Sequence, residues 1–204
     1  MRTLQSSGPP ESRLDLVFVG DGFSEKERSE YNKRVHICLG YLWSVSPFRE
    51  LKGKFNVHVV DNPSPRQPGW DSQGRRKSTG SSFRLKDSTD KATVISASQA
   101  QIKEVLEAAK SAPEADAVIL LTTRFGRSRT HLGNAILLTD GQFDAVTHEL
   151  GHLIGGLGDE YIDAALLVGR TYDSSNGDLA YPNLHRRGYL DTSSRQSLKE
   201  TTKW

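Results

Sequence analysis

Two histidines placed four residues apart are the part of the chain best suited to chemistry. They belong to the run His148-Glu149-Leu150-Gly151-His152. Because each residue of a helix turns the chain by about 100°, side chains four positions apart lie one above the other on one face. Their imidazoles can therefore bind one tetrahedral zinc ion, while Glu149 acts on water at the open position of the metal. We predict a zinc site with His148 and His152 as ligands and Glu149 as the catalytic residue.

A third protein ligand is expected soon after the second histidine. In zinc peptidases of the metzincin type, a glycine three residues after this histidine turns the chain back, and a ligand follows three residues later. Here Gly155 stands at the turn position, but Gly158 occupies the ligand position and has no donor atom. A turn shifted by one residue, to Gly156, makes Asp159 the predicted third ligand, since a carboxylate is an accepted zinc ligand. The alternatives, in falling order, are Glu160 and Asp163.

Sequence patterns outside the metal site resemble a known family. The metal-site run continues as Gly155-Gly156-Leu157-Gly158-Asp159-Glu160-Tyr161, and four other stretches accompany it, at residues 14–24, 47–48, 55–57 and 79–83. Together they resemble the immunoglobulin A peptidase family of zinc metallopeptidases, over about residues 14–204. The resemblance implies a zinc-dependent endopeptidase with a zincin-like catalytic domain and Zn²⁺ as cofactor. It does not imply an immunoglobulin substrate.

The chain departs from these patterns in several ways. The metzincin methionine turn is missing, because the only methionine is Met1. The resemblance implies that many members carry a further N-terminal domain, which we do not expect in this chain. It also implies a pattern that continues beyond Trp204, so we expect a truncated C-terminal subdomain. A cleft without one wall would favour the alternative function, a metal-retaining but catalytically inactive module that binds peptides or proteins. Several downstream residues are candidates to assist an oxyanion, and the sequence does not choose among them: Tyr161, Tyr172, Tyr181, His185 and Tyr189.

Hydrophobic runs and helix caps predict an α/β fold, a zincin-like mixed sheet flanked by helices, with the metal on the helix that carries the histidines. Apolar or alternating runs predict strands at residues 14–19, 55–60, 92–96, 115–122 and 134–139. Ser24 with Glu27, and Ser98 with Gln101, form capping boxes that begin helices ending near residues 43 and 111. A long surface loop is expected over residues 61–91, which are rich in Pro, Gly, Ser and basic residues.

Three further expectations concern the sheet. In zincins an edge strand pairs with an extended substrate backbone, and the candidates here are residues 134–138 and the loop 125–132 before them. Asp15, inside the first predicted strand, is expected to face solvent at an edge. Asp21 is expected to cap the turn between Gly20 and Gly22, the alternative being a ligand site at the carboxyl end of the strand.

Length and composition fit one catalytic domain, residues 1–204, of which residues 1–13 are expected to be flexible. The 27 basic and 25 acidic residues nearly cancel, so a nucleic acid or a membrane is not expected as a partner. The peptidase resemblance implies a peptide or protein substrate. Basic runs at 75–77 and 124–129 are expected in solvated loops. Cys38, the only cysteine, is expected to be a buried thiol. The sequence has neither the apolar core of a signal peptide nor a transmembrane run, so localisation is not readable from it. The oligomeric state is not readable either.

Overall fold

The computed structural model describes residues 1–65, 69–70, 72, 74, 80–87, 95–112, 114–131 and 134–157. Contacts divide the chain into two units, Met1–Leu153 and Ile154–Trp204, and the fold described below is that of the first unit. The strands are β1 (Arg2–Gln5), β2 (Leu14–Asp21), β3 (Phe55–Val60), β4 (Lys86–Asp87), β5 (Ile95–Ser96), β6 (Ala117–Thr122), β7 (Arg129–His131) and β8 (Ala135–Leu138). The α-helices are α1 (Arg28–Leu42), α2 (Gln99–Ala109) and α3 (Ala145–Gly155).

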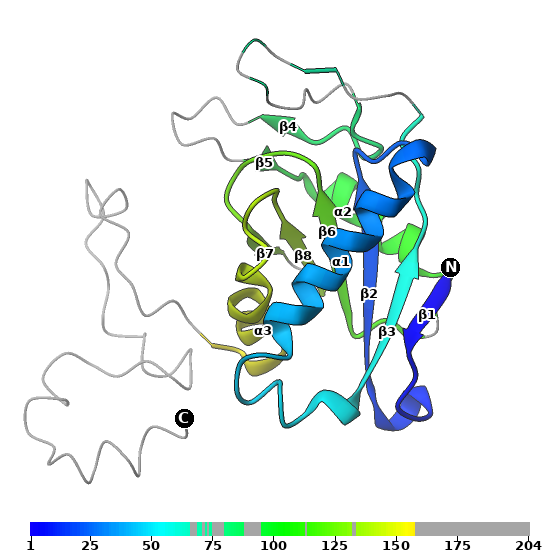
Figure 1. Ribbon diagram of the computed structural model, residues 1–204, viewed down its shortest axis with the longest axis vertical. Helices are drawn as coiled ribbons and strands as arrows, with labels where there is room; N and C mark the ends of the chain where they lie inside the picture. The colour runs from blue at the N-terminus through cyan, green and yellow to red at the C-terminus, as the bar shows by residue number, and fades with distance from the viewer. Residues whose placement is uncertain are drawn as a thin grey trace, which may run out of the picture. The chain divides into compact units, whose positions relative to one another are not determined.

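Six of these strands form one mixed sheet, in the order β1-β3-β2-β6-β8-β7, which confirms the predicted α/β class (Figure 1). The four central strands pair in parallel, whereas β1 and β7 are antiparallel to their neighbours. Strands β3, β6 and β8 are buried at every position, as the continuous apolar runs of β6 and β8 predict. The remaining two strands, β4 and β5, pair with each other.

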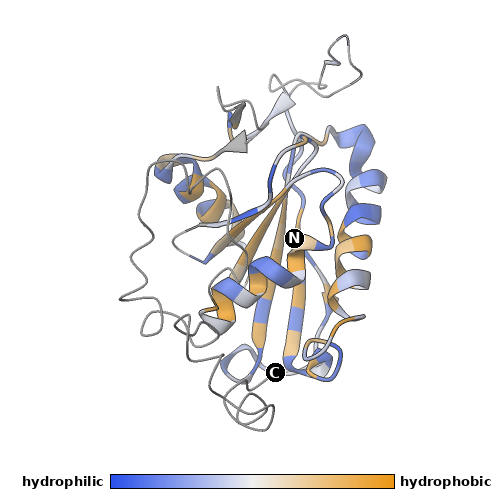
Figure 2. Ribbon diagram, turned by 90° about the vertical axis from the view of Figure 1, so that its left-hand side faces the viewer, coloured by the Kyte–Doolittle hydropathy of each residue, from blue (hydrophilic) through white to orange (hydrophobic). Residues whose placement is uncertain are grey.

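Helices cover both faces of the sheet. One core joins α1 and α3 to the sheet through side chains that include Val35, Leu42, Val146 and Leu150. A second core on the other face contains Val105 of α2. In Figure 2 the strands between these layers are mostly coloured as hydrophobic. Since α1 and α3 share a core, the helix with the two histidines lies on the same face as α1 (Figure 1).

The predicted capping boxes begin the helical segments of α1 and α2. The main-chain N–H of Ser24 donates to Glu27 Oε2 at 3.0 Å, and a short 3₁₀ turn there leads into α1. The N–H of Ser98 donates to Gln101 Oε1 at 2.7 Å, and the Ser98 hydroxyl accepts from the N–H of Gln101 at 3.3 Å. Each box satisfies main-chain donors that a helix leaves open at its start, so local sequence determines where these helices begin.

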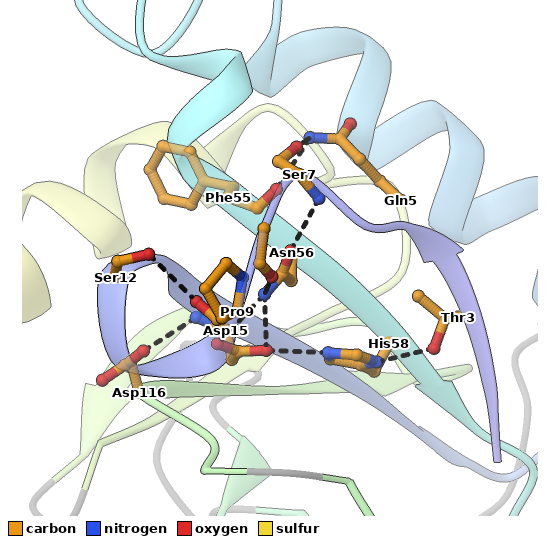
Figure 3. Close-up of polar contacts among 11 residues, drawn as sticks. Thr3, Gln5, Ser7, Pro9, Ser12, Asp15, Phe55, Asn56, His58 and Asp116 are labelled. Carbon is orange, nitrogen blue, oxygen red and sulfur yellow. Dashed lines mark hydrogen bonds and ion pairs between the residues drawn. The ribbon is translucent and has the colours of Figure 1, made fainter.

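Residues 1–13, which we expected to be flexible, contribute β1 and a 3₁₀ turn at Pro10–Ser12. The strand pairs with β3, and three polar side chains beneath it form a buried network (Figure 3). Asp15 Oδ1 accepts from His58 Nε2 at 2.8 Å and from Asn56 Nδ2 at 3.2 Å. His58 Nδ1 lies 3.0 Å from the hydroxyl of Thr3, and the N–H of Ser7 donates to Asn56 Oδ1 at 2.8 Å. The network thus connects the N-terminal segment to the sheet.

The expectation that Asp15 faces solvent at an edge is therefore wrong. Strand β2 lies between β3 and β6, and Asp15 is fully buried. A strand with neighbours on both sides, in a sheet whose two faces are covered by helices, has no edge at which a carboxylate could face solvent. Burial of a charged group is tolerated when other groups hydrogen-bond to it, and here His58 and Asn56 supply those bonds.

Asp21 does not cap the turn between its flanking glycines either. Its Oδ1 accepts from the Ser81 hydroxyl at 2.8 Å and from the N–H of Phe83 at 3.3 Å, and its Oδ2 accepts from the Thr122 hydroxyl at 3.0 Å. Burial raises the pKa of the Asp21 carboxyl group. Hydrogen bonds to this group oppose the rise, and the one from Ser81 has the largest opposing effect. Asp21 thus holds a segment distant in sequence against the carboxyl ends of β2 and β6.

This segment corrects two expectations about loops. Phe83 and Leu85 lie within the predicted surface loop 61–91, yet both are buried in the core that faces α2. Arg124, at the start of a basic run expected to be solvated, is also buried, and its Nη1 donates to the carbonyl of Leu85 at 2.5 Å. Burial lowers the pKa of the Arg124 guanidinium group. The nearby Asp21 opposes this shift, but the effect of burial is larger. The other basic run, 75–77, lies outside the described residues.

The helices bear on two remaining features, the cysteine and the membrane search. Cys38 is a buried free thiol, as expected, and burial raises its pKa to about 12. Within the described part of the chain, none of the helices combines the length and the apolar character needed to cross a bilayer.

Replacing Asp15 by alanine is expected to lower the free energy of unfolding by about 3 kcal/mol, because buried groups left unpaired each cost about 1–3 kcal/mol. The change would leave His58 and Asn56 without their shared acceptor. Asp116→Ala is the matched control, since Asp116 is exposed and accepts one bond, from the N–H of Asp15 at 2.7 Å. Its expected cost is about 1 kcal/mol. Urea unfolding of both variants measures the difference, and equal losses would contradict a structural role for the buried network.

Candidate metal centre

The segment that leads into α3 is held by an arginine from α1. Arg34 Nη1 donates to Asp140 Oδ1 at 2.5 Å, and the guanidinium lies 5.9 Å from the ring centre of Phe143. Asp140 follows β8, and Phe143 comes just before the helix. The N–H of Ala145 then donates to the carbonyl of Gln142 at 3.2 Å as the chain turns into α3. Contacts with α1 therefore hold the segment that connects β8 to the start of α3.

Within α3 the two histidines point toward one another. Their Nε2 atoms lie 3.0 Å apart, and the ring centres lie 4.4 Å apart with the ring planes at 82°. Two nitrogens that each lie about 2.0–2.1 Å from one tetrahedral zinc are separated by roughly 3.3 Å. His148 and His152 therefore have a spacing that suits chelation of one ion. His148 is exposed and His152 is half-buried, so both are open to solvent.

The carboxylate between them has a different environment. Glu149 is only 5% exposed, although it stands next to an exposed histidine. Its Oε2 accepts from the hydroxyl of Thr130 at 2.7 Å, and the same hydroxyl lies 3.0 Å from the main-chain carbonyl of Glu149. Thr130 belongs to β7, the last strand of the described sheet. The carboxylate is thus held between its helix and the last strand of the described sheet.

The residues expected to complete the ligand set lie outside the described residues. These are Asp159 and its alternatives Glu160 and Asp163, and the same holds for the five candidates to assist an oxyanion. Across the described ranges, which end at residue 157, no cluster of three or more metal-ligating side chains occurs. The described residues include the first residues of the expected turn after α3. Gly155 is the last residue of the helix, and Gly156 has φ +61°. Glycine adopts this left-handed conformation readily and commonly ends a helix with it.

The two candidates for an edge strand have different outcomes. The strand within residues 134–138 is β8, which lies between β6 and β7 and so is not at an edge. The loop 125–132 contains β7, which pairs only with β8 among the described strands. The sequence named this loop as a candidate but did not predict a strand in it, because Arg129–His131 is too short to be recognised as one. The strand is identified by its pairing with β8.

Thr130 was not singled out from the sequence. It lies in an arginine-rich stretch with no catalytic motif, and its neighbour in space, Glu149, is far from it along the chain. The available signal was indirect: a carboxylate buried within a metal motif needs a hydrogen-bond donor, and hydroxyl groups occur in the stretch before the helix. Sequence alone offers several hydroxyl groups there and does not distinguish them.

The mixed sheet with helices on both faces is consistent with the zincin-like metallopeptidases as a class. Comparison with known families assigns the chain more narrowly. The family described as IgA Peptidase M64 matches residues 3–183, which is most of the chain, and the chain belongs to this family. No curated protein sequence matches it. Membership supports a protease, hence a hydrolase acting on peptides or proteins, and M64 peptidases are generally metallopeptidases.

Replacing either histidine of α3 by alanine is expected to weaken zinc binding by more than about 100-fold, since residues that merely support ligands already cost about 10–100-fold. Far-UV circular dichroism should be unchanged, because neither imidazole is part of the buried core. His36→Ala is the control, since His36 is exposed on α1. Competition with a chromogenic chelator measures the affinities. Parental affinity in His148→Ala or His152→Ala would remove that residue from the ligand set.

Proposed function

We propose that the chain is a zinc-dependent endopeptidase in which His148 and His152 bind the metal and Glu149 is the general base. The observation that carries the proposal is the 3.0 Å separation of the two Nε2 atoms on α3. Two neutral imidazoles four residues apart, next to a carboxylate, form the donor set of catalytic zinc sites. The family match supports the proteolytic part of the proposal.

Asp159 is the third ligand in this proposal. Gly156, rather than Gly155, has the positive φ, so the turn begins one residue later than in the metzincin pattern. Three residues beyond Gly156 stands Asp159, which has a carboxylate to offer, whereas a turn at Gly155 would lead to Gly158. Glu160 is the alternative ligand. The one of these two that does not bind zinc would accept a hydrogen bond from a ligand imidazole, as carboxylates around zinc sites do.

The proposed chemistry divides the work between the metal and Glu149. When bound, zinc supplies Lewis acidity that activates water and polarises the scissile carbonyl group. Glu149 takes the proton of the attacking water and later delivers it to the leaving amine. Thr130 bonds to Oε2, so Oε1 is the atom assigned to this proton transfer. The near-complete burial of Glu149 limits competing bulk water around the carboxylate.

An extended peptide would bind along β7. This strand is paired on one side with β8, and its other side ends the described sheet. Peptides add to such edges through main-chain hydrogen bonds, while side-chain pockets select the sequence. The hydroxyl of Thr130 reaches Glu149 from this strand, so a peptide paired with β7 would lie near the proposed base.

Glu149→Gln is expected to lower kcat/KM for a peptide substrate by about 10²–10⁴, the usual contribution of general acid–base catalysis, while zinc stays bound. Glutamine keeps the size of the side chain and can still accept from Thr130, so the fold should be unaffected. The control is Glu107→Gln, an exposed residue of α2. Cleavage of a mixed peptide library, followed by mass spectrometry, measures the change. A Glu149→Gln protein as active as the parent would overturn the assigned role, and a parent that binds zinc but cleaves nothing would favour a binding module.

The identity of the third ligand can be tested by single substitutions. Asp159→Ala is expected to reduce zinc affinity more than Glu160→Ala, because only Asp159 has the spacing from Gly156 that returns a ligand to the metal. The loss at Asp159 should resemble that of a histidine ligand, and the loss at Glu160 should be about 10–100-fold at most. Chelator competition gives both values. The reverse ranking would make Glu160 the ligand.

A further inference from the structure

The contact between Thr130 and Glu149 joins two segments that are unrelated in sequence. One hydroxyl reaches both ends of the same residue, 2.7 Å from the carboxylate oxygen Oε2 and 3.0 Å from the main-chain carbonyl. A hydroxyl has one proton, and the shorter bond is to the charged acceptor, which is the stronger type. Because both acceptors belong to Glu149, the hydroxyl limits how the side chain of Glu149 can rotate relative to its own helix.

Thr130 is itself well placed to hold another group. In the antiparallel pairing of β7 with β8, Thr130 stands opposite Ile136, which is completely buried. Threonine is branched at Cβ, so its first side-chain torsion has few choices. On the other side of the contact, Glu149 is flanked by the buried Leu150, which packs into the core shared with α1. The hydroxyl therefore connects a strand and a helix that are both fixed by the sheet.

We infer that Thr130 is a positioning residue for the general base. By holding Oε2, Thr130 turns the other oxygen, Oε1, toward the water that attacks the substrate. A peptide paired along β7 would bond to the main chain of this strand, which the side chain of Thr130 does not alter. The Thr130 hydroxyl itself acts only through Glu149 in this scheme. The inference rests on the proposed function, because it assigns a role in the reaction that Glu149 performs there.

A residue that only connects the strand to the helix would behave differently. Its loss would lower stability, and any effect on turnover would be the same whether or not a hydroxyl remained at the position. A positioning hydroxyl has two specific consequences. Its removal lowers kcat with little change in KM, because substrate binding does not need the correct orientation of the base. Serine, which keeps the hydroxyl, restores kcat.

The kinetic test compares Thr130→Val, which is nearly isosteric and has no hydroxyl, with Thr130→Ser in the zinc-loaded protein. We expect Thr130→Val to lower kcat by about 10- to 100-fold, in the range that misplacement of a reacting group costs, with KM within about twofold. Thr130→Ser should recover kcat to within about threefold of the parent. The matched control is Thr3→Val, which also removes a hydroxyl bonded to a buried side chain, from the strand at the opposite edge of the sheet. Its kcat should equal that of the parent.

A second measurement does not depend on activity. Crystal structures of the parent and of Thr130→Val should show the Glu149 carboxylate displaced in the variant, with the two Nε2 atoms still about as close as the 3.0 Å seen here. Thr130→Ala serves as the hydroxyl-free variant if valine prevents folding. An unmoved carboxylate, a kcat within about twofold of the parent, or equal losses in the valine and serine variants would each overturn the inference. A parent that binds no zinc or cleaves no peptide would refute the proposed function, whereas the crystal comparison still decides whether Thr130 orients Glu149.

Discussion

The register of α3 against the sheet decides where its chemical groups point. Val146 and Leu150 are buried, and His148 and His152 follow them by two residues each. Two residues of an α-helix span about 200°, so burying one pair four residues apart directs the other pair to the opposite side. Glu149 falls between these two faces and is turned toward the sheet, where it meets Thr130. Packing of two apolar side chains thereby sets the directions of both imidazoles and of the carboxylate.

The sheet contributes rigidity on each side of this helix. Ile136 and Leu138 of β8 belong to the core shared by α1 and α3, while Leu137 belongs to the core on the α2 face. Because β8 is packed on both faces, it holds the short β7 that pairs with it in place. The hydroxyl of Thr130 in β7 donates to the carboxylate of Glu149 in α3. At the start of the helix, Arg34 bonds to Asp140 and so limits movement between α1 and the turn after β8. The candidate centre is therefore held by contacts from α1, β7 and the core together.

Local sequence predicts what local interactions determine. The strands β2, β3, β6 and β8, the two capping boxes and the helix with the histidines follow from patterns of a few residues, and the structure confirms them. Expectations failed where partners come from far along the chain. Asp15 is buried because β2 has strands on both sides. Phe83 is buried because its N–H donates to Asp21 and its side chain packs into the core on the α2 face. No window of sequence around these residues contains their partners.

The same division runs through the candidate site. The spacing of His148 and His152 is a property of one helix, so the sequence alone could place both imidazoles on one face, and the 3.0 Å between their Nε2 atoms agrees with that geometry. The surroundings of Glu149 depend on the order of the strands. In this sheet β8 lies between β6 and β7, and β7 contacts α3 through Thr130. A metal motif therefore specifies which atoms can meet the metal. How a base beside that metal is oriented depends on which strand the fold brings next to it, and in this chain that strand presents the hydroxyl of Thr130.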